Sequence, residues 1–368
     1  MDPAQLRADI PLGESVYLNT GASGPAPDRV LEAGRAHQAS HEREWTLEDD
    51  PYAAAWADYE RTRERIAAFA ECSPDQISLC GSTADGISRI ANALEWTAGD
   101  CVVRTDLEHP AGVLPWARLE EEGIEVREVP APGGRLDFER LHEALEGADL
   151  LCFNSISWIH GTQLDIERAC AAAHEHGALA LVDAVQTPGQ SSFDPTGWNA
   201  DFVVGAGHKW LLGVWGAGFL YVDADVVERL RPRHVSYRSV TDMEQVPLEY
   251  HAGARRLEVG TSSLGPHAAL REALDIHAEL GLETIERQIG GLVERLVDHL
   301  PADRLVSPAR PESGLVAFEV EDADATVERL AAEDVIVRTL PRPDTVRASV
   351  HVFNTAEDID RLAGALAG

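Results

Sequence analysis

The chain has 368 residues, of which 44% are apolar; this is enough for large buried cores and suggests two or more domains. Acidic residues number 63 against 31 basic ones, and the resulting charge of −32 excludes nucleic acid and anionic membranes as partners. No stretch approaches the roughly 20 apolar residues that cross a bilayer, and no secretion signal is recognisable, so a cytoplasmic protein is expected.

The basic side chains are almost all arginines, and Lys209 is the sole lysine. Acids spread along the chain, with arginine in place of lysine, suit a salt-rich cytoplasm in which screening removes self-repulsion. We therefore expect a halophilic protein; an ordinary acidic protein is the alternative. The five cysteines are odd in number and lack CxxC spacing, which predicts free buried thiols and no metal site.

Between about residues 76 and 222, short apolar runs alternate with helical patterns. This alternation predicts an α/β fold: a mainly parallel, seven-stranded sheet with helices on both faces and a ligand site beyond the carboxyl ends of its strands. The predicted strands are Ile77–Cys80, Cys101–Arg104, Ile124–Val129, Leu150–Ser155, Leu179–Asp183, Asp201–Val204 and Gly218–Val222.

Two of the intervening helices have clear limits in the sequence. Asp137 can cap one that ends at Gly147, and Asp165 can cap the next, which ends at Gly177.

The C-terminal part reads as a second, smaller α/β domain. Its predicted elements are helices over Pro266–Leu280 and Leu282–Leu300, a strand near Leu315–Val320, a helix near Ala325–Ala332, strands near Val335–Arg338 and Arg347–Phe353, and a final helix with a capping box of Thr355 and Asp358. We expect a large domain over residues 16–275 and a small domain over residues 276–368 that also includes residues 1–15.

Lys209 lies in VVGAGHKWLLGVWGAG, just after a predicted buried strand and among glycines. Arginine can replace lysine wherever only charge matters, but it cannot form an imine, because the guanidinium stays protonated. The surviving lysine is therefore a candidate for imine chemistry. A chance leftover is the alternative.

Two further motifs fit the same chemistry. Asp183 ends a strand in LALVDAVQ, where a carboxylate can hold a pyridine nitrogen protonated, and Gln186 can donate to a phenolic oxygen of such a ring. Ser82 and Thr83 open a predicted helix, whose N-terminus can bind a phosphate. Taken alone, Asp183 could cap a turn, and Ser82 and Thr83 could be ordinary N-caps.

Together these motifs resemble the fold-type I enzymes that use pyridoxal phosphate (PLP), specifically the class V aminotransferase and cysteine desulfurase family. The resemblance covers nearly the whole chain, and its VDxxQ and GHK elements are the strongest signals. The matching segments are YLNTGASGP at 17–25, GSTADGI at 81–87, EHPAGVLPW at 108–116, SISWIHGTQLDI at 155–166, LVDAVQTPG at 181–189, DFVVGAGHKWLLG at 201–213, EVGTSS at 258–263 and VRASVHVFNTAEDID at 346–360.

The resemblance implies PLP as cofactor and assigns roles residue by residue. Lys209 would form the internal aldimine, Asp183 would pair with the pyridinium, Gln186 would contact the phenolic oxygen and His109 would stack on the ring. Ser82, Thr83 and His208 would hold the phosphate, helped by Thr261 from a second subunit, which implies a homodimer. By the same resemblance Arg347 would bind the substrate carboxylate. Asn19, Trp158 and His160 are further candidate substrate residues, and His160 could act as an extra acid or base. Taken alone, His109, Arg347 and His160 would be structural or surface residues.

The chain departs from the desulfurases where their nucleophilic cysteine stands. After Val337–Arg338–Thr339 the loop is short, LPRPDT, and contains no cysteine. Desulfurases also place Asn where Trp158 stands. A persulfide needs a thiolate beside the substrate sulfur. The expected activity is therefore aminotransfer or Cβ–S lyase chemistry on a small α-amino acid. The alternatives are a desulfurase that borrows a thiol, an epimerase, and a regulatory subunit without activity.

Overall fold

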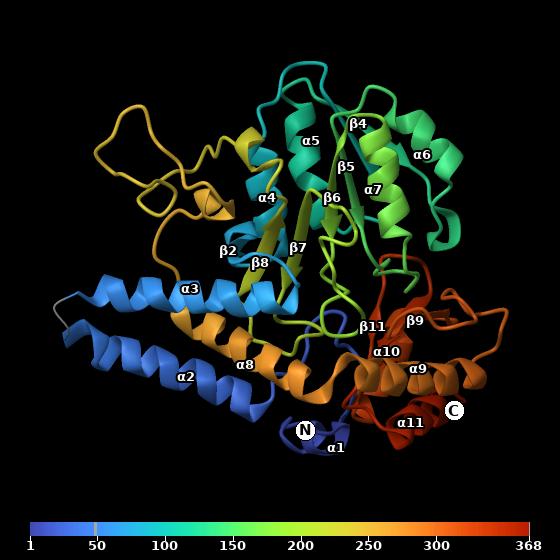
Figure 1. The fold of residues 1–368 in the computed structure, drawn as a ribbon. Coiled ribbons are helices and arrows are strands. Elements are labelled where there is room, and N and C mark those ends of the chain that lie inside the picture. Colours follow the sequence, from blue (N-terminus) through green and yellow to red (C-terminus); the bar gives the residue numbers. More distant parts are fainter. Residues whose placement is uncertain (48–49, 368) are drawn as a thin grey trace.

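The computed structural model describes residues 1–47 and 50–367, and its centre is a seven-stranded sheet (Figure 1). The strand order is β2-β8-β7-β6-β5-β3-β4, and only β8 runs antiparallel to its neighbours. The mainly parallel α/β fold predicted from the sequence is confirmed. The strands are β2 (Ile77–Cys80), β3 (Cys101–Thr105), β4 (Glu125–Val129), β5 (Leu150–Asn154), β6 (Leu179–Asp183), β7 (Phe202–Ala206) and β8 (Gly218–Val222).

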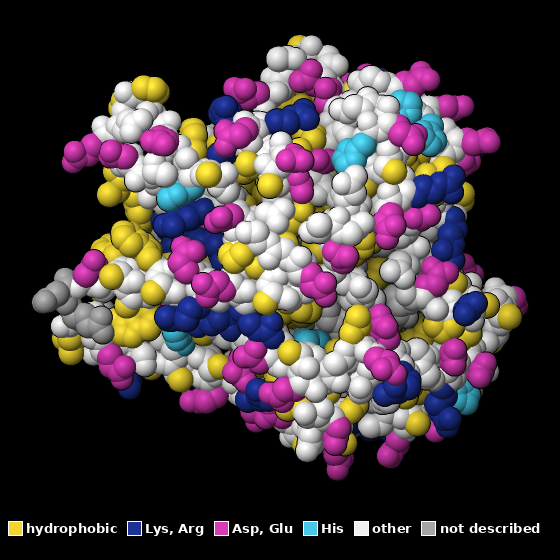
Figure 2. Space-filling view, viewed as in Figure 1, with side chains coloured by type: hydrophobic (Ala, Val, Ile, Leu, Met, Phe, Trp, Pro, Cys, Tyr) yellow, Lys and Arg dark blue, Asp and Glu magenta, His cyan; other side chains and the backbone are white. Residues whose placement is uncertain are grey.

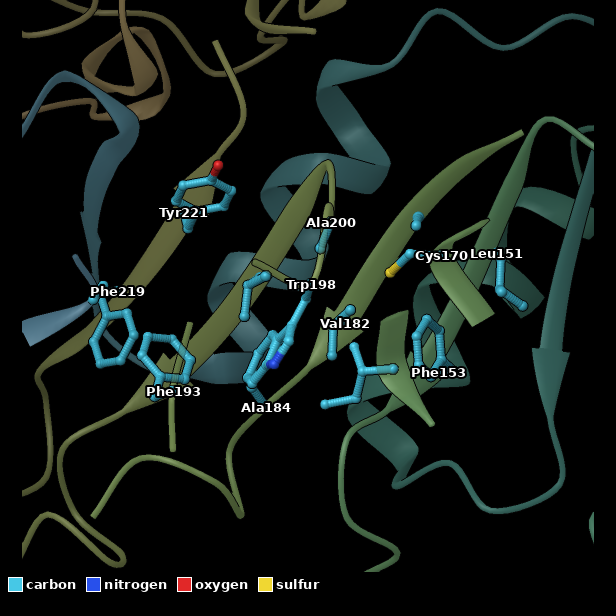
Figure 3. Close-up of a cluster of buried hydrophobic side chains, with 14 of the residues drawn as sticks. Leu151, Phe153, Cys170, Val182, Ala184, Phe193, Trp198, Ala200, Phe219 and Tyr221 are labelled. Atoms are coloured by element: carbon cyan, nitrogen blue, oxygen red, sulfur yellow. The ribbon is translucent and has the colours of Figure 1, made fainter. Parts of the chain in front are cut away.

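The central strands β5, β6, β7 and β8 are buried on both faces, which explains why they are almost entirely apolar, whereas the edge strand β4 carries Glu125, Arg127 and Glu128. Along β5, Leu151 and Phe153 pack on one side with α3 (Pro51–Phe69), α6 (Phe138–Leu145) and α7 (Ile166–Glu175). On the other side of the sheet, Leu150 and Cys152 pack with α4 (Thr83–Ala93) and α5 (Leu114–Glu120). Figure 3 shows Phe153 in the first of these clusters, with Val182, Trp198 and Phe193.

The predicted helix starts are confirmed. The Asp137 carboxylate accepts from the backbone N–H of Glu139 at 3.0 Å, and that of Asp165 accepts from Arg168 at 3.2 Å. Gly147 and Gly177, placed just after these helices, have φ of +68° and +78°, the left-handed region that glycine adopts without strain.

A second group of elements surrounds a smaller sheet of order β11-β12-β9, antiparallel throughout. Its strands are β9 (Leu315–Glu319), β11 (Arg338–Thr339) and β12 (Thr345–Ser349), and a separate parallel pair joins β1 (Val16–Tyr17) to β10 (Val335–Ile336). The helices here are α8 (Leu264–Leu280), α9 (Leu282–His299), α10 (Ala323–Ala332) and α11 (Ala356–Ala367), with α1 (Pro3–Ala8) and α2 (Asp28–Arg43) from the N-terminal part.

Both ends of the chain join the core of this second group. Leu6 and Val16 pack in one cluster with Phe318 and Ile359. Arg7 pairs with Asp358 at 2.7 Å, and α1 and α11 lie side by side in Figure 1. The predicted capping box is present, because the Thr355 N–H donates to the Asp358 carboxylate at 3.0 Å and the Asp358 N–H donates to Thr355 Oγ1 at 3.2 Å.

One predicted strand is divided. Residues 335–338 form two short strands rather than one, because β10 pairs with β1 whereas β11 pairs with β12. The change of partner falls at Val337, and it leaves Arg338 opposite Arg347. Strand β12 also begins and ends earlier than the predicted segment 347–353.

Acidic side chains are scattered over the visible face of the molecule, with arginines between them (Figure 2). They form no single tail or patch there. None of the helices in residues 1–47 and 50–367 is both long and apolar enough to cross a membrane.

Candidate active site

A cavity of about 370 Å³ lies at the carboxyl ends of β5, β6 and β7, where an α/β sheet is expected to bind its ligand. Nearly all of the residues predicted from the sequence line it: Ser82, Thr83, His109, Trp158, Asp183, Gln186, His208, Lys209 and Arg347. Asn154, Trp215 and Arg338 line it as well, and sequence reasoning did not select them.

Lys209 follows β7 on a tightly packed turn. The backbone N–H of Gly24 donates to the carbonyl of His208 at 2.7 Å, and a Cβ on Gly24 would stand only 2.1 Å from the carbonyl oxygen of Lys209. Only glycine allows this approach. Burial is the largest influence on the pKa of Lys209 and lowers it to about 8. The charge of Asp183 acts in the other direction and raises this pKa, whereas the charges of Arg347 and Arg338 lower it. At pH 7 the amine is therefore neutral in about a tenth of the molecules, far more than for an ordinary lysine.

Asp183 is the last residue of β6 and is buried. Its Oδ1 accepts from the backbone N–H of Val185 at 3.0 Å. Burial raises the pKa of this carboxyl, whereas that hydrogen bond and the charge of Lys209 oppose the rise. A buried carboxylate needs a cation, so this end of the cavity favours a positively charged ligand group.

Gln186 has a fixed orientation. Its Oε1 accepts from the indole Nε1–H of Trp210 at 2.7 Å, and its Nε2 donates to the carbonyl of Gly21 at 3.1 Å. An amide nitrogen carries two hydrogens. One of them therefore remains for an acceptor in the cavity, as the sequence-based hypothesis requires.

Ser82 and Thr83 stand at the N-terminus of α4. Ser82 is its N-cap, since its Oγ accepts from the N–H of Asp85 at 3.1 Å. The hydroxyl of Thr83 is buried and has no hydrogen-bond partner in the described part of the chain. Burial and the charge of Lys209 lower the pKa of His208 to about 4, so its ring is neutral and has one N–H to donate. Helix amides, a free hydroxyl and a ring N–H together suit a phosphate.

Arg347 and Arg338 also line the cavity. Arg347 is fully buried; its Nη1 donates to the carbonyl of Trp158 at 2.6 Å, and its Nε and Nη2 have no partner among the described residues. Burial lowers the pKa of Arg347 to about 9, and the charge of Arg338 adds to this effect. Unpaired guanidinium donors of this kind bind carboxylates.

Part of the cavity wall is aromatic, formed by Trp158 and His109. The indole of Trp158 donates to the carbonyl of Leu107 at 3.1 Å, and its ring meets that of His109 edge-on, with centroids 5.3 Å apart. The Nδ1 of His109 accepts from the N–H of Ala111 at 3.2 Å, which leaves the proton of the neutral ring on Nε2. Burial lowers the pKa of His109, and the nearby cations lower it further.

Three predicted residues lie outside the cavity of their own chain. The Oδ1 of Asn19 is buried without a hydrogen-bond partner among the described residues. His160 contacts Nη1 of Arg342 through Nε2 at 2.7 Å and Ser157 Oγ through Nδ1 at 3.2 Å, so it anchors the short loop after β11. Thr261 is exposed, and its N–H donates to the hydroxyl of Tyr237 at 2.8 Å.

None of the described residues that line the cavity is a cysteine. The five thiols are free, and all except Cys72 are buried. Burial raises the pKa of Cys72 and Cys101 to about 11 and that of Cys80 to about 12. None of them is a thiolate near neutral pH, as a nucleophile must be.

The sequence profile of the Aminotransferase class-V family matches residues 16–362. The chain belongs to this family of PLP-dependent enzymes. Among class V relatives, a probable cysteine desulfurase of Methanothermobacter thermautotrophicus is 30% identical, with 100% of this chain and 98% of that protein covered. The isopenicillin N epimerase of Streptomyces clavuligerus is 28% identical, with 95% and 94% covered.

Among solved class V structures, the cystine C-S lyase C-DES in complex with cysteine persulfide superposes with a TM-score of 0.91. It is 26% identical, and 97% of this chain and 98% of that chain are covered. A mutant of C-DES with glycine covalently linked to its PLP cofactor gives a TM-score of 0.92, with 98% of each chain covered at the same identity.

The residues present fit the class V cofactor. The cavity is within the range of about 300–1,000 Å³ that is typical of small-molecule sites. Lys209 offers an amine, the buried carboxyl of Asp183 needs a cation, and the unpartnered hydroxyl of Thr83 needs an acceptor. PLP has an aldehyde, a basic ring nitrogen and a phosphate, which match these three groups.

Proposed function

We propose that this class V enzyme is a Cβ–S lyase that acts on a small amino acid carrying a second anionic group, such as a disulfide of two amino acids. The observation that carries the proposal is the pair of Arg338 and Arg347 beside Lys209, in a cavity that contains no thiol. Two arginines suit two anionic groups, and elimination needs a base but no nucleophilic cysteine. The similarity to the cystine C-S lyase supports the same reaction.

In the proposed reaction, the Cα–H and Cβ–S bonds of the substrate break, and water is consumed. The products are pyruvate, ammonia and a thiol, or a persulfide where the substrate is a disulfide. Bound PLP supplies an electron-withdrawing ring to which the substrate amine is joined, and this ring makes the Cα proton acidic.

The side chains of the enzyme carry out the remaining steps. Arg347 would bind the substrate carboxylate, and Arg338 the second anionic group. Lys209 Nζ would take the Cα proton, since its pKa of about 8 leaves a neutral amine available. Lys209, protonated in this step, would pass the proton to the departing sulfur, and the Nε2–H of neutral His109 would donate a hydrogen bond to that sulfur. Asp183 would keep the ring nitrogen protonated, and Gln186 would donate to the phenolic oxygen. Ser82, Thr83 and His208 would hold the phosphate.

Trp158 would limit the space for the substrate. Its indole is tethered to Leu107, and its carbonyl holds Arg347. The same residue therefore forms one wall of the cavity and fixes the carboxylate-binding group.

We also propose that the enzyme is a homodimer in which Thr261 of one subunit reaches the phosphate site of the other. Support comes from its position: Thr261 is exposed and does not line the cavity of its own chain. A salt-rich cytoplasm is the proposed location, supported by the charge of −32 and the free cysteines.

The decisive test is a product assay with purified holoenzyme. Cystine, cysteine, aspartate and glutamate would be supplied separately, and pyruvate, ammonia, persulfide and keto acids would be measured. Equal amounts of pyruvate and ammonia from cystine support the lyase. Formation of a keto acid together with amination of a second keto acid would instead identify an aminotransferase, because a dicarboxylic amino acid would use the same two arginines. Racemisation of the substrate would identify an epimerase, and enzyme-bound persulfide a desulfurase. No turnover of any amino acid would indicate a regulatory protein.

A further inference from the structure

Glu108 is a buried carboxyl at the edge of the cofactor site, and none of the proposed steps uses it. It is only 7% exposed. Glu108 comes shortly after the end of β3, Asn154 is the last residue of β5, and Asp183 is the last residue of β6. These three strands are neighbours in the sheet. Asn154 and Asp183 are also paired in register. Glu108, Asn154 and Asp183 therefore form a row along the carboxyl edge of the sheet.

All of the hydrogen bonds of Glu108 fall on one oxygen. Its Oε1 accepts from Thr105 Oγ1 at 2.7 Å, from the backbone N–H of Asn154 at 3.1 Å and from Asn154 Nδ2 at 3.0 Å. Its Oε2 is buried and has no partner among the described residues. A buried acid with several hydrogen bonds forms part of a polar network, and removing one member of such a network destabilises the groups that remain.

These contacts determine which end of the Asn154 amide faces the ligand. Asn154 lines the cavity, and its Nδ2 is held by Glu108. Its Oδ1 is buried and has no partner among the described residues, so an acceptor remains beside Asp183. With the amide reversed, an N–H dipole would stand there and would oppose a protonated ring nitrogen.

We propose that Glu108 is a positioning residue, which clamps the Asn154 amide so that its oxygen, together with Asp183, favours the protonated form of the cofactor ring. This inference rests on the cofactor pocket of the proposed function but not on which substrate bond is broken. Burial raises the pKa of Glu108 to about 8, and the charge of Asp183 contributes to the rise. A neutral Glu108 leaves Asp183 as the anion beside the ring.

The proposal is tested by cofactor binding, without turnover. The dissociation constant for PLP of the apoenzyme and the absorption spectrum of the bound cofactor would be measured for Glu108→Leu, Glu108→Gln, Asn154→Ala and the Glu108→Leu/Asn154→Ala double variant. We expect Glu108→Leu to weaken PLP binding at least about tenfold and to shift the spectrum towards the unprotonated ring. Glu108→Gln should behave like the parent protein, because the Asn154 backbone N–H holds the amide oxygen of glutamine in the place of Oε1.

Asn154→Ala should match Glu108→Leu, and the double variant should be no worse than either single variant, since both remove the same interaction. Additive losses, or Glu108→Gln binding as poorly as Glu108→Leu, would overturn the proposal. If Glu108→Leu does not fold, the comparison of Glu108→Gln with Asn154→Ala still decides: Gln must retain the parental affinity, and Ala must lose it.

Asp201 provides the matched control. It is also 7% exposed and accepts from a backbone N–H, that of Ala180, at the opposite end of the sheet. Asp201→Leu should lower the thermal midpoint of the apoenzyme without changing PLP affinity. If Asp201→Leu also lost PLP affinity, general destabilisation would explain the result for Glu108→Leu, and the positioning role of Glu108 would be refuted.

Discussion

Arg338 and Arg347 lie directly opposite each other on the antiparallel strands β11 and β12. Like charges in this arrangement repel and destabilise a sheet. Both side chains line the cavity; among the described residues they donate only to backbone carbonyls, Arg338 to Thr339 and Arg347 to Trp158, and neither forms an ion pair. The proposed function accounts for this pair, because an anionic substrate would supply the counter-charge that the two arginines lack.

Replacing Arg338 by Gln should therefore raise the stability of the ligand-free protein and weaken substrate binding. We expect the ligand-free protein to gain roughly 0.5–1 kcal/mol of unfolding free energy, because the repulsion is removed. The KM for a substrate with two anionic groups should rise at least about tenfold. Chemical denaturation and steady-state kinetics measure the two effects. Arg342→Gln is the matched control: its guanidinium contacts His160 outside the cavity, so KM should not change. Unchanged KM in Arg338→Gln would remove Arg338 from the substrate site.

Trp210, the residue after Lys209, offers a second prediction. Trp210 fixes the amide of Gln186 through a 2.7 Å hydrogen bond and is fully buried. Trp210→Phe keeps much of the apolar volume but removes this bond, so Gln186 is free to rotate. We expect PLP affinity to fall by about threefold to tenfold, equivalent to a hydrogen bond of about 1 kcal/mol. Gln186→Ala in the same background should add little, and a fully additive loss would contradict the coupling.

Much of this architecture could be predicted from the sequence, because local signals specify it. Asp137 and Asp165 are helix caps with glycine stops, and Asp183 was found because it ends an apolar run. Lys209 was found because every other basic position is arginine. These signals need no knowledge of which strands are neighbours.

The residues that sequence reasoning missed depend on contacts between distant segments. Arg338 faces the cavity only because the chain changes partner at Val337, and a one-residue shift would turn its side chain away. The buried carboxyl of Glu108 accepts two hydrogen bonds from Asn154, which belongs to another strand. Neither fact is encoded in a local pattern, so spacing alone could not identify these two residues.

The depressed pKa of Lys209 predicts how cofactor attachment depends on pH. Covalent attachment of PLP needs the neutral amine, and burial lowers the pKa of Lys209 from 10.5 to about 8. The attachment rate of the apoenzyme should therefore rise about tenfold per pH unit below pH 8 and level off above it. Stopped-flow absorbance measures the rate, and mass after borohydride reduction confirms the attachment site. Lys209→Ala is the control and should show no attachment. A rate that keeps rising up to about pH 10 would indicate an unperturbed lysine.

The role proposed for Thr261 predicts complementation between two inactive variants. Lys209→Ala lacks the lysine, and Thr261→Asp places a negative charge where the phosphate should bind. If Thr261 serves the partner's cavity, a mixed dimer contains one site with both parental residues. Random mixing of subunits should then restore about a quarter of the parental activity. If Thr261 serves its own subunit, both sites of the mixed dimer are defective, and mixing restores nothing. Lys209→Ala mixed with the parent protein is the control for interference: activity per parental subunit should not change, because the variant still supplies Thr261.

The charge of −32 predicts that stability increases with salt. Raising KCl from about 0.1 M to about 1 M shortens the Debye length from roughly 10 Å to roughly 3 Å, which weakens repulsion between surface acids. The thermal midpoint should therefore rise. A Glu286→Gln/Glu294→Gln variant tests the cause, because both side chains are exposed on α9 and neither forms an ion pair in the described part of the structure. Its midpoint should be higher than that of the parent at low salt, and its salt dependence should be shallower. An equal rise in sucrose of matched osmolality would point to solvent exclusion rather than charge screening.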